Sequence, residues 1–546
     1  MQRKQRSYAD ADSQITSNHD IDKARWGNYL NLATALLAPL AILLPELAPL
    51  LVVGGLAQFG LGLDQAINGR DLQSRDAGVT ELAFGLFNAL PAAGQGVAKY
   101  GSVFRCTRPG FFAPVRLAQL LGTPVGAAPI AEAIDSVELA FREQAIVSNN
   151  SLAAVVARID ENLEHRFMAW LQTREGVVGE WVHYEFASDS FIRSRDSNLI
   201  APLRWRLANA EDTALTPLRQ RHIATHSQRS TTLQALGIDL DLPVDYAPYA
   251  QLQRTPIPKI ISSVWLGDAL LHGEFLEALV HNVRIARSSG YRYQILLSQQ
   301  GPQVFQRNVQ VLRTRAEGAQ LLPLETQGFF QAFSRSPYYR QYLAAIEGNG
   351  GSGRNFSSAC DILRYRLLNH YGGLYLDADD RLLAASKGEL SPPLANVALT
   401  TTHDGLLFSP PVSNDQLGMY IKFNNSMIGS HPANPTLDAV SDEILRRYSL
   451  APDFYDSRPD PRQAPLPFQG YARRLNLISG PGALNAVVDE RLPLLRQLRE
   501  ICHLLVSPVY DIHATLNLGR FHAVLREHAP LDRIARIGRE HSWTLT

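Results

Sequence analysis

Two carboxylates, Asp377 and Asp379, follow directly after the short apolar segment "LYL" in the stretch "SSACDILRYRLLNHYGGLYLDADD" (357–380). Residues two apart on a strand project to the same side, so we expect both carboxylates to face one way. Like charges placed in this way repel unless a cation or hydrogen-bond donors lie between them. Carboxylates suit Mg²⁺ or Mn²⁺, which keep open positions for substrate phosphates. The pair indicates a metal site for a diphosphate-bearing substrate; the alternative is a solvated turn with incidental acids.

A second pair, Asp361 and Arg364, precedes the first and shares one face of a predicted helix, because the two are three residues apart. The guanidinium offers forked donors that suit oxyanions. Two structural alternatives stand beside this interpretation: Ser358 caps the helix with Asp361 in a capping box, and Arg364 only pairs with an acid on its own helix. Gly372-Gly373 is expected to close the helix in a left-handed conformation. Asp380 is expected to point away from its two partners, and we assign it no role.

The surrounding residues alternate between predicted strands and helices. Strands are expected at 257–267 and 291–298, and helices at 274–290, Val304–Ala316 and Phe329–Ile346, the last interrupted at a proline, Pro337. This alternation predicts an α/β domain with a largely parallel sheet, in which ligands bind beyond the carboxyl ends of the strands. The sequence has no Gly-x-x-x-x-Gly-Lys phosphate loop, which argues against a nucleotide hydrolase.

An Asp-x-x-Arg helix followed by Tyr-Gly-Gly-x-Tyr-x-Asp-x-Asp resembles the donor-binding motif of GT-A-fold (Rossmann-like) glycosyltransferases with a DXD motif. The resemblance is to the sugar-binding-region family shared by initiating mannosyltransferases and large glucosylating bacterial toxins. "IPKIISSVWLGD" resembles the family's opening strand but has Ser262 where many members have His. "FNNSMIGSHPANPTLDAV" resembles a middle segment, and "EHSWTLT" resembles the terminal Ser-Trp element. The four blocks occur in the family's order over roughly residues 256–546.

The resemblance implies roles for the charged residues. Asp379 would ligate Mn²⁺ or Mg²⁺ directly, with help from Asp377 and Ser542. Asp377 would also bind ribose or sugar hydroxyls, and Asp361 would hydrogen-bond sugar hydroxyls. Arg364 would reach the sugar or the diphosphate.

The resemblance also implies roles for aromatic and amide residues. Trp265 would stack on the nucleobase, although a core anchor is the alternative for an indole at this position. Asn425 matches the family's asparagine, and the adjacent Asn424 stays open. Ser542 and Trp543 would order over the donor as a lid, where a chain end normally frays.

The reaction that the family implies is transfer of glucose or N-acetylglucosamine from a UDP-sugar to an acceptor hydroxyl, with retention at the anomeric carbon. The metal and Arg364 would neutralise charge on the leaving diphosphate. No acid pair in the sequence is arranged like the nucleophile and acid of a glycosidase.

Composition and length limit the remaining possibilities. The chain has 546 residues, of which 45% are apolar and 19% charged, as in a folded protein of two to four domains. The formal net charge is zero, so we expect no nucleic-acid partner. Three widely spaced cysteines argue against a disulfide framework. The polar N-terminus shows no signal peptide, and we expect it to be the cut end of a longer protein.

Residues 1–145 are expected to form a helical region like the translocation region of toxins. The segment 27–63 carries Glu46 as its only charge, and Pro45-Glu46 divides it into two apolar halves. Each half is slightly shorter than a membrane-spanning helix. Two interpretations stay open: a buried helical pair, or a hairpin that enters membranes when acid neutralises Glu46.

Residues 146–250 are expected to form a helical connector and linker before a catalytic domain at 251–546. A proline-rich stretch at 239–258 marks the boundary. The predicted amphipathic helix rests on apolar residues at helical spacing: Leu152, Val155, Val156, Ile159, Leu163, Phe167 and Leu171.

The sequence context favours one acceptor over others. "RSYADADSQI" and "LGLDQAINGRDLQSRDAGV" resemble segments of dermonecrotic-toxin-like proteins. We therefore expect a secreted bacterial effector that glycosylates a host protein, such as a small GTPase, in the host cytosol or at the host membrane. The alternatives are an enzyme acting on polysaccharide or lipid-linked glycan, and a membrane-inserting module with an inactive transferase domain.

Overall fold

The computed structural model describes residues 151–538, apart from 162–163, 200, 219–222, 387, 415, 511 and 513–515. All described residues belong to one compact unit. The predicted helical region 1–145, with its apolar segment 27–63, lies outside the described residues. Within the described ranges, no helix has both the length and the apolar character needed to cross a membrane.

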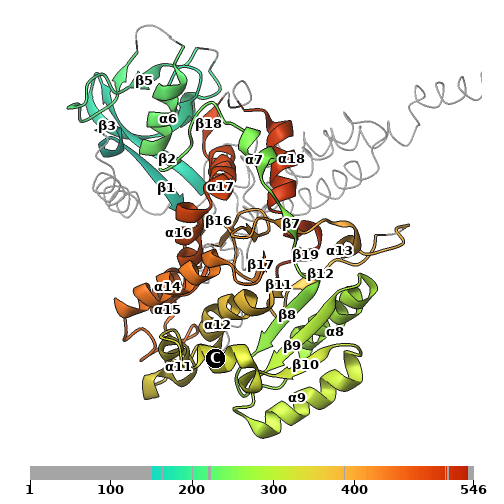
Figure 1. The fold of residues 1–546 in the computed structure, drawn as a ribbon. Coiled ribbons are helices and arrows are strands. Elements are labelled where there is room, and N and C mark those ends of the chain that lie inside the picture. Colours follow the sequence, from blue (N-terminus) through green and yellow to red (C-terminus); the bar gives the residue numbers. More distant parts are fainter. Residues whose placement is uncertain are drawn as a thin grey trace, which may run out of the picture. The chain divides into compact units, whose positions relative to one another are not determined.

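The first described region contributes six strands, drawn in teal and green in Figure 1, to a seven-stranded sheet. Six strands follow one another antiparallel along the chain, and β18 (Val509–Tyr510) adds a parallel strand beside β3. The six are β1 (Val156–Glu161), β2 (Glu164–Thr173), β3 (Gly176–Glu185), β4 (Ser190–Arg193), β5 (Arg204–Arg206) and β6 (Thr216–Pro217). Helix α6 (His226–Ala235) follows, with a capping box formed by Thr225 and Gln228.

The amphipathic helix predicted from residue 148 onward is wrong, because β1 and β2 occupy this stretch. Phe167, Ala169 and Leu171 are buried, whereas Met168 and Trp170 between them are partly exposed. This alternation has the period of two that a strand with one buried face produces. The apolar positions fit both the helical period of about 3.6 and the strand period of two, and the pairing of β1 with β2 decided in favour of the strand.

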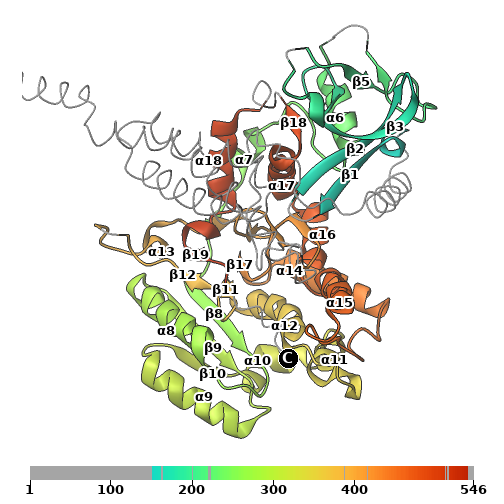
Figure 2. The ribbon, with the colours of Figure 1, turned by 180° about the vertical axis from the view of Figure 1, so that it is seen from behind.

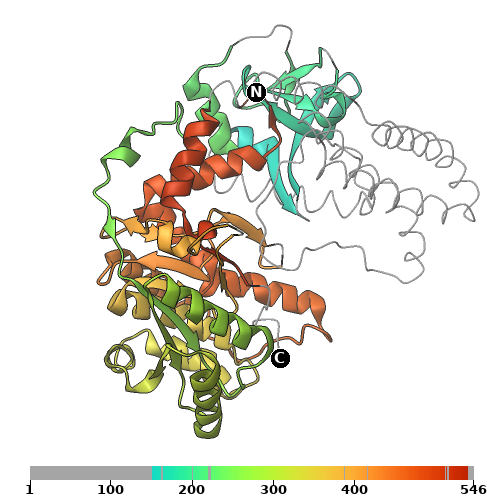
Figure 3. The ribbon, with the colours of Figure 1, turned by 90° about the vertical axis from the view of Figure 1, so that its right-hand side faces the viewer.

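A connection through α7 (Ala247–Gln251) and β7 (Thr255–Pro256) leads to the second large sheet. It runs beside the C-terminal helices α17 (Pro493–Val506) and α18 (Leu518–His528), as Figure 3 shows. The Tyr249 hydroxyl donates to the Leu494 carbonyl at 2.7 Å, and Arg254 Nη2 donates to the Glu527 carbonyl at 2.8 Å. These bonds tie the proline-rich stretch to the end of the chain.

The second large sheet has six strands in the order β10-β9-β8-β11-β17-β14. The first four are parallel, which confirms the predicted α/β class with a largely parallel sheet. At the other edge, β17 pairs antiparallel with β11, and β14 pairs antiparallel with β17. The strands are β8 (Ile260–Trp265), β9 (Arg292–Leu297), β10 (Gln320–Pro323), β11 (Gly373–Leu376), β14 (Leu406–Leu407) and β17 (Met427–Ser430).

Helices cover both faces of this sheet (Figures 1 and 2). On one face, α8 (Gly273–Ser288) and α9 (Pro302–Arg315) pack in a cluster with Ile261, Tyr293 and Leu374. On the other face, α12 (Phe356–Tyr371) packs in a cluster with Leu296 and Tyr375. The alternation of side chains along each strand thus supplies two cores, as expected for a sheet buried on both faces.

The remaining elements are helices and three short strand pairs. The predicted break at Pro337 is confirmed, because it separates α10 (Gly328–Phe333) from α11 (Tyr339–Glu347). The other helices are α13 (Pro393–Asn396), α14 (Pro435–Ser449), α15 (Pro465–Ile478) and α16 (Pro481–Arg491). Three strand pairs complete the structure: β7 with β13 (Thr400–Thr401), β15 (Val412–Asn414) with β16 (Met419–Lys422), and β12 (Arg381–Leu382) with β19 (Ala535–Arg536).

Candidate active site

Helix α12 presents the pair Asp361 and Arg364, and it begins directly after Asn355, whose side chain accepts from the Ser358 N–H at 2.9 Å. The capping box with Ser358 as the cap is therefore wrong. Asparagine caps helices as well as serine does, and here it lies three residues earlier. Ser358 instead makes a 2.6 Å hydrogen bond to Ser479. Asp361 consequently lies beyond the first helical turn and takes no part in the cap.

The predicted closure of α12 at two glycines is confirmed. Gly372 and Gly373 both have positive φ, 63° and 81°. A β-carbon on Gly373 would lie 3.0 Å from the Pro258 carbonyl oxygen and closer still to that of Ile260. The glycine therefore permits both the turn and the close approach of β11 to β8.

The aspartates lie on a turn rather than on a strand. β11 ends at Leu376, and the Asp380 N–H donates to the Asp377 carbonyl at 3.1 Å. The period-of-two argument for Asp377 and Asp379 therefore does not apply. Both nevertheless line the same cavity, because the turn lies at the carboxyl end of a parallel strand.

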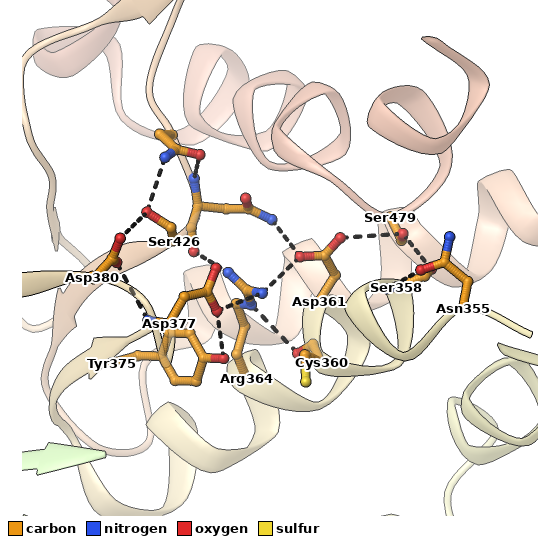
Figure 4. A network of polar contacts seen from close by, with 12 residues as sticks. Asn355, Ser358, Cys360, Asp361, Arg364, Tyr375, Asp377, Asp380, Ser426 and Ser479 are labelled. Carbon is orange, nitrogen blue, oxygen red and sulfur yellow. Dashed lines mark hydrogen bonds and ion pairs between the residues drawn. The ribbon is translucent and has the colours of Figure 1, made fainter. Parts of the chain in front are cut away.

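Arg364 joins the helix to the turn (Figure 4). Its Nη2 lies 2.8 Å from Asp361 Oδ1 and 3.1 Å from Asp377 Oδ1. Its Nη1 donates to the Asn425 carbonyl, and the guanidinium lies 4.6 Å from the centre of the Tyr375 ring. The alternative in which Arg364 pairs only with an acid on its own helix is wrong. One cation holds two carboxylates of like charge side by side.

The arginine side chain is itself only 2% exposed. Its Nε donates to the Cys360 carbonyl at 3.4 Å, so all three nitrogens already have protein partners. This arrangement favours a role in positioning the carboxylates. Direct contact of Arg364 with a diphosphate stays a prediction.

Asp361 is held from several sides and titrates near neutrality. It accepts from Asn425 Nδ2 at 2.9 Å and from Ser479 Oγ at 3.4 Å. Burial raises the pKa of its carboxyl to about 7, although the Arg364 cation acts in the opposite direction. Burial also raises the pKa of Asp377, whose Oδ1 accepts from the Tyr375 hydroxyl at 2.8 Å.

The structure distinguishes the two adjacent asparagines. Asn425 binds Asp361 through its side chain, as described above. Asn424 turns toward Ser426, donating from Nδ2 to Oγ at 2.9 Å, and its Oδ1 accepts from the Asn425 N–H at 2.8 Å. This geometry favours Asn425, the residue first chosen, as the one that acts with the carboxylates.

Trp265 lies at the carboxyl end of β8 and lines the same cavity. Its indole N–H donates to the Ala269 carbonyl at 3.0 Å, and its ring packs edge-on against Phe275 at 5.2 Å. The side chain is only partly buried, so it is not simply a core anchor. Stacking of the indole on a base stays a prediction.

The cavity that these residues share has a volume of about 620 Å³. Its size is within the range of small-molecule sites. Apolar and charged residues from several segments complete the lining, including Phe275, Arg354, Phe356, Arg458, Asp460, Asn476 and Gly538. The predicted residues of α12, β8 and the turn after β11 are thus brought to one cavity.

Asp380 is the site residue that the sequence analysis missed. We assigned it no role on the basis of a strand geometry that the turn does not have, yet it lines the same cavity and is fully buried and bonded. Its Oδ1 accepts from the Gly538 N–H at 2.8 Å and from Ser426 Oγ at 3.4 Å. Burial raises the pKa of its carboxyl, and the charges of Asp379 and Asp377 add to the effect. The only signal in the sequence was a third acid in the run.

Two further predicted residues, Ser542 and Trp543, lie outside the described residues. In the part of the chain that the structure describes, no three His, Cys, Asp or Glu side chains are grouped so that they could hold a metal ion. Any cation at this turn would therefore need ligands beyond Asp377 and Asp379. That requirement fits Mg²⁺ or Mn²⁺, which take few protein carboxylates and complete their shell with substrate phosphates and water.

Residues 302–391 match the family model for the glycosyltransferase sugar-binding region containing the DXD motif. The match includes Asp361, Arg364, Asp377 and Asp379, and it confirms the resemblance drawn from these residues. This part of the chain is a DXD-containing glycosyltransferase region, and the protein is a glycosyltransferase. No curated protein matches the sequence.

Several solved structures are similar at low identity. The PaToxG glycosyltransferase is 16% identical, covers 53% of this chain and 91% of its own, and has a TM-score of 0.36. The UDP-bound glycosyltransferase domain of the YGT toxin is 13% identical, covers 44% and 78%, and has a TM-score of 0.29. The catalytic domain of Clostridium novyi alpha-toxin is 11% identical, covers 54% and 81%, and has a TM-score of 0.31. These scores are too low to bear on the geometry of the site.

Proposed function

We propose that this glycosyltransferase moves glucose or N-acetylglucosamine from a UDP-sugar to a hydroxyl of a host protein, with retention and with Mn²⁺ or Mg²⁺ as cofactor. The observation that supports the proposal is the convergence of Asp361, Asp377 and Asp379 on one cavity, with Arg364 buried between the first two. Three carboxylates and an arginine at the carboxyl end of a parallel strand suit a polar, charged ligand.

The proposed division of labour follows from these contacts. Asp379 and Asp377 would hold the cation, which when bound neutralises charge on the diphosphate. The Oδ1 atom of Asp377 is occupied by Arg364 and Tyr375, so the carboxylate enters the site in a fixed orientation. Asp361, accepting from Asn425, would accept from sugar hydroxyls when ionised. Preorganised groups of this kind stabilise charge without reorganising during the reaction.

Release of UDP tests the donor and the metal. We expect the protein to release UDP from UDP-glucose or UDP-N-acetylglucosamine when Mn²⁺ is present, and not when it is chelated. Asp379→Asn should lower the rate at least about 100-fold, because it removes charge where the cation binds. The exposed Asp453→Asn serves as the matched control and should leave the rate unchanged. If Asp379→Asn unfolds the protein instead, the carboxylate is structural.

The acceptor is proposed from the toxin-like sequence context, with action as a secreted effector in the host cytosol or at the host membrane. Mass spectrometry of a host-cell lysate treated with the protein and labelled UDP-sugar checks it. A sugar on a Ser, Thr or Tyr hydroxyl of a small GTPase is the expected result. Labelling of glycans alone would favour a polysaccharide or lipid-linked acceptor. Absence of turnover with every donor would favour the inactive membrane-inserting module.

A further inference from the structure

The last described residues of the chain lie across the aspartate turn. Strand β19 pairs antiparallel with β12, which follows the turn directly. The Leu383 N–H donates to the Ile534 carbonyl at 2.8 Å beside this pair. Two residues after β19, the Gly538 N–H reaches Asp380 Oδ1 at 2.8 Å. The segment is therefore attached to the turn at both ends of a short ladder.

Gly538 is packed directly against the carboxylate of Asp379. A β-carbon at position 538 would collide with Oδ2 and Cγ of Asp379, and would lie 2.7 Å from its carbonyl carbon. Gly538 has no left-handed φ, so available space accounts for the absence of a side chain there. The backbone of Gly538 thus forms one wall that limits where the Asp379 carboxylate can turn.

Asp380 holds this wall in place. Its side chain is fully buried, and its Oδ2 accepts from the Asp377 N–H at 3.3 Å while Oδ1 accepts from Gly538. Its carbonyl accepts from Asn282 Nδ2 at 2.7 Å, and Asn282 Oδ1 accepts from the Leu382 N–H at 2.8 Å. Buried carboxylates that accept backbone N–H bonds make strong, oriented contacts. The neighbour of Asp379 is therefore fixed on both its side chain and its backbone.

We infer that Asp380 and Gly538 are a positioning pair: Asp380 holds the Gly538 peptide against Asp379, and this contact orients the Asp379 carboxylate for a divalent cation. The inference rests on the proposed function for its cation, and it assigns a role to two residues that do not themselves bind the metal. Partners that orient a metal ligand commonly change metal affinity about 10- to 100-fold when they are removed.

Mn²⁺ affinity, measured by isothermal titration calorimetry with UDP present to supply the diphosphate, tests the positioning role. Gly538→Ala should weaken Mn²⁺ binding at least about tenfold, because its β-carbon displaces the carboxylate. Gly470→Ala, at a helical glycine with open space around it, is the matched control and should bind Mn²⁺ like the wild type. Asp380→Ala should weaken binding as Gly538→Ala does, and Asp380→Asn should restore part of it by keeping an oxygen for the Gly538 N–H.

Amide hydrogen exchange tests, without metal, whether the Asp380 side chain anchors the Gly538 N–H. A peptide that ends at Gly538 should exchange slowly in the wild type and in Asp380→Asn, and faster in Asp380→Ala. The melting temperature of the metal-free variants is measured alongside, and Gly538→Ala keeps the test valid if Asp380→Ala does not fold. Unchanged exchange in Asp380→Ala would overturn the anchor.

The two proposals fail in different ways. If the wild type binds Mn²⁺ and Asp379→Asn does not, but Gly538→Ala and Asp380→Ala bind within twofold of the wild type, the positioning role is overturned and the proposed function stands. If the wild type binds neither Mn²⁺ nor Mg²⁺, the metal-dependent function is overturned and the positioning role with it.

Discussion

The two sheets of this protein each carry a buried network of arginine and carboxylates, and only one of the networks lines the 620 Å³ cavity. In the seven-stranded sheet, Arg204 binds Glu185 through two hydrogen bonds of 2.7 and 2.6 Å. Nearby, Asp189 accepts from Tyr184 at 2.8 Å and from Thr232 at 2.6 Å. These carboxylates are satisfied within the protein, as structural ion pairs are.

At the turn after β11, the carboxylates are held by the protein on one side and open to the cavity on the other. Asp377 binds Arg364 and Tyr375 through Oδ1, and its side chain is still 29% exposed. The comparison teaches that burial and ion pairing do not by themselves mark a site. What distinguishes the second network is that its acids lie where a ligand can reach them.

Removal of Arg364, the arginine of the cavity network, should have the largest effect and should distinguish the two networks most clearly. Arg364→Met leaves the buried Asp361 and the partly exposed Asp377 without their cation, so we expect a loss of about 3–5 kcal/mol in the free energy of unfolding. The rate of UDP release should fall at least about 100-fold in the protein that remains folded. Denaturant unfolding measures the loss of stability. The rate of UDP release is measured at a temperature where both the wild type and Arg364→Met are folded.

Arg204→Met is the matched change in the other network. It should destabilise the protein less, because Arg204 is 18% exposed where Arg364 is 2% exposed. It should leave the rate of UDP release per folded molecule within about twofold, because Arg204 does not line the cavity. A large loss of activity in this variant would break the comparison.

The titration of Asp361 makes the rate of UDP release depend on pH, which gives a second way to test the cavity network. Because its pKa is raised to about 7, the carboxylate that would accept sugar hydroxyls is progressively protonated as pH falls below about 7. The rate of UDP release should therefore decline on the acid side of neutrality. Asp361→Asn should lower the rate about 10- to 150-fold, as expected for one lost charged hydrogen bond of about 1.5–3 kcal/mol, and should remove this acid limb. A limb that persists in Asp361→Asn belongs to another group.

A pair of tyrosine hydroxyls gives a smaller, matched test. Tyr375 donates to Asp377 at 2.8 Å in the cavity network, and Tyr184 donates to Asp189 at 2.8 Å in the other. Each Tyr→Phe change should cost about 1–3 kcal/mol of stability, since a buried acceptor loses its donor. Only Tyr375→Phe should also raise the KM for the UDP-sugar, because it loosens Asp377. A rise in KM for Tyr184→Phe would contradict the division.

The smallest expected effect concerns His528, a buried residue that lies outside both networks and packs edge-on against Tyr249 at 5.1 Å. Burial lowers its pKa from 6.5 to about 4. The unfolded chain therefore binds the proton first, so this contribution to stability is complete above pH 6.5 and is lost as pH falls from 6.5 to about 4. The difference in melting temperature between wild type and His528→Gln should narrow over this range, and a difference that stays constant would contradict the prediction.

The sequence analysis succeeded where local signals agreed and failed where two periods overlapped. Gly290, Pro337 and the Gly372-Gly373 pair mark element ends in both the sequence and the structure, because each has a local conformational cause. Between residues 152 and 171, apolar residues fit a helix and a strand, and hydrogen bonds between strands that follow one another in the chain decided the outcome. β2 pairs with β3 from Thr173 and Gly176 outward, so the glycine at 176, which has a positive φ, was the local turn signal that the helical interpretation overlooked.

By itself, the sequence determined the chemistry available and the elements that carry it: an Asp-x-x-Arg helix, a glycine break, a short buried strand and the acids that follow. Only the tertiary structure decided that Asn355 rather than Ser358 caps that helix, and that Asn425 rather than Asn424 meets Asp361. It alone placed Gly538 on the turn, 158 residues from its partner Asp380. Residue types and their spacing can be read along the chain, whereas the contacts of Asn425 with Asp361 and of Gly538 with Asp380 depend on how distant segments pack.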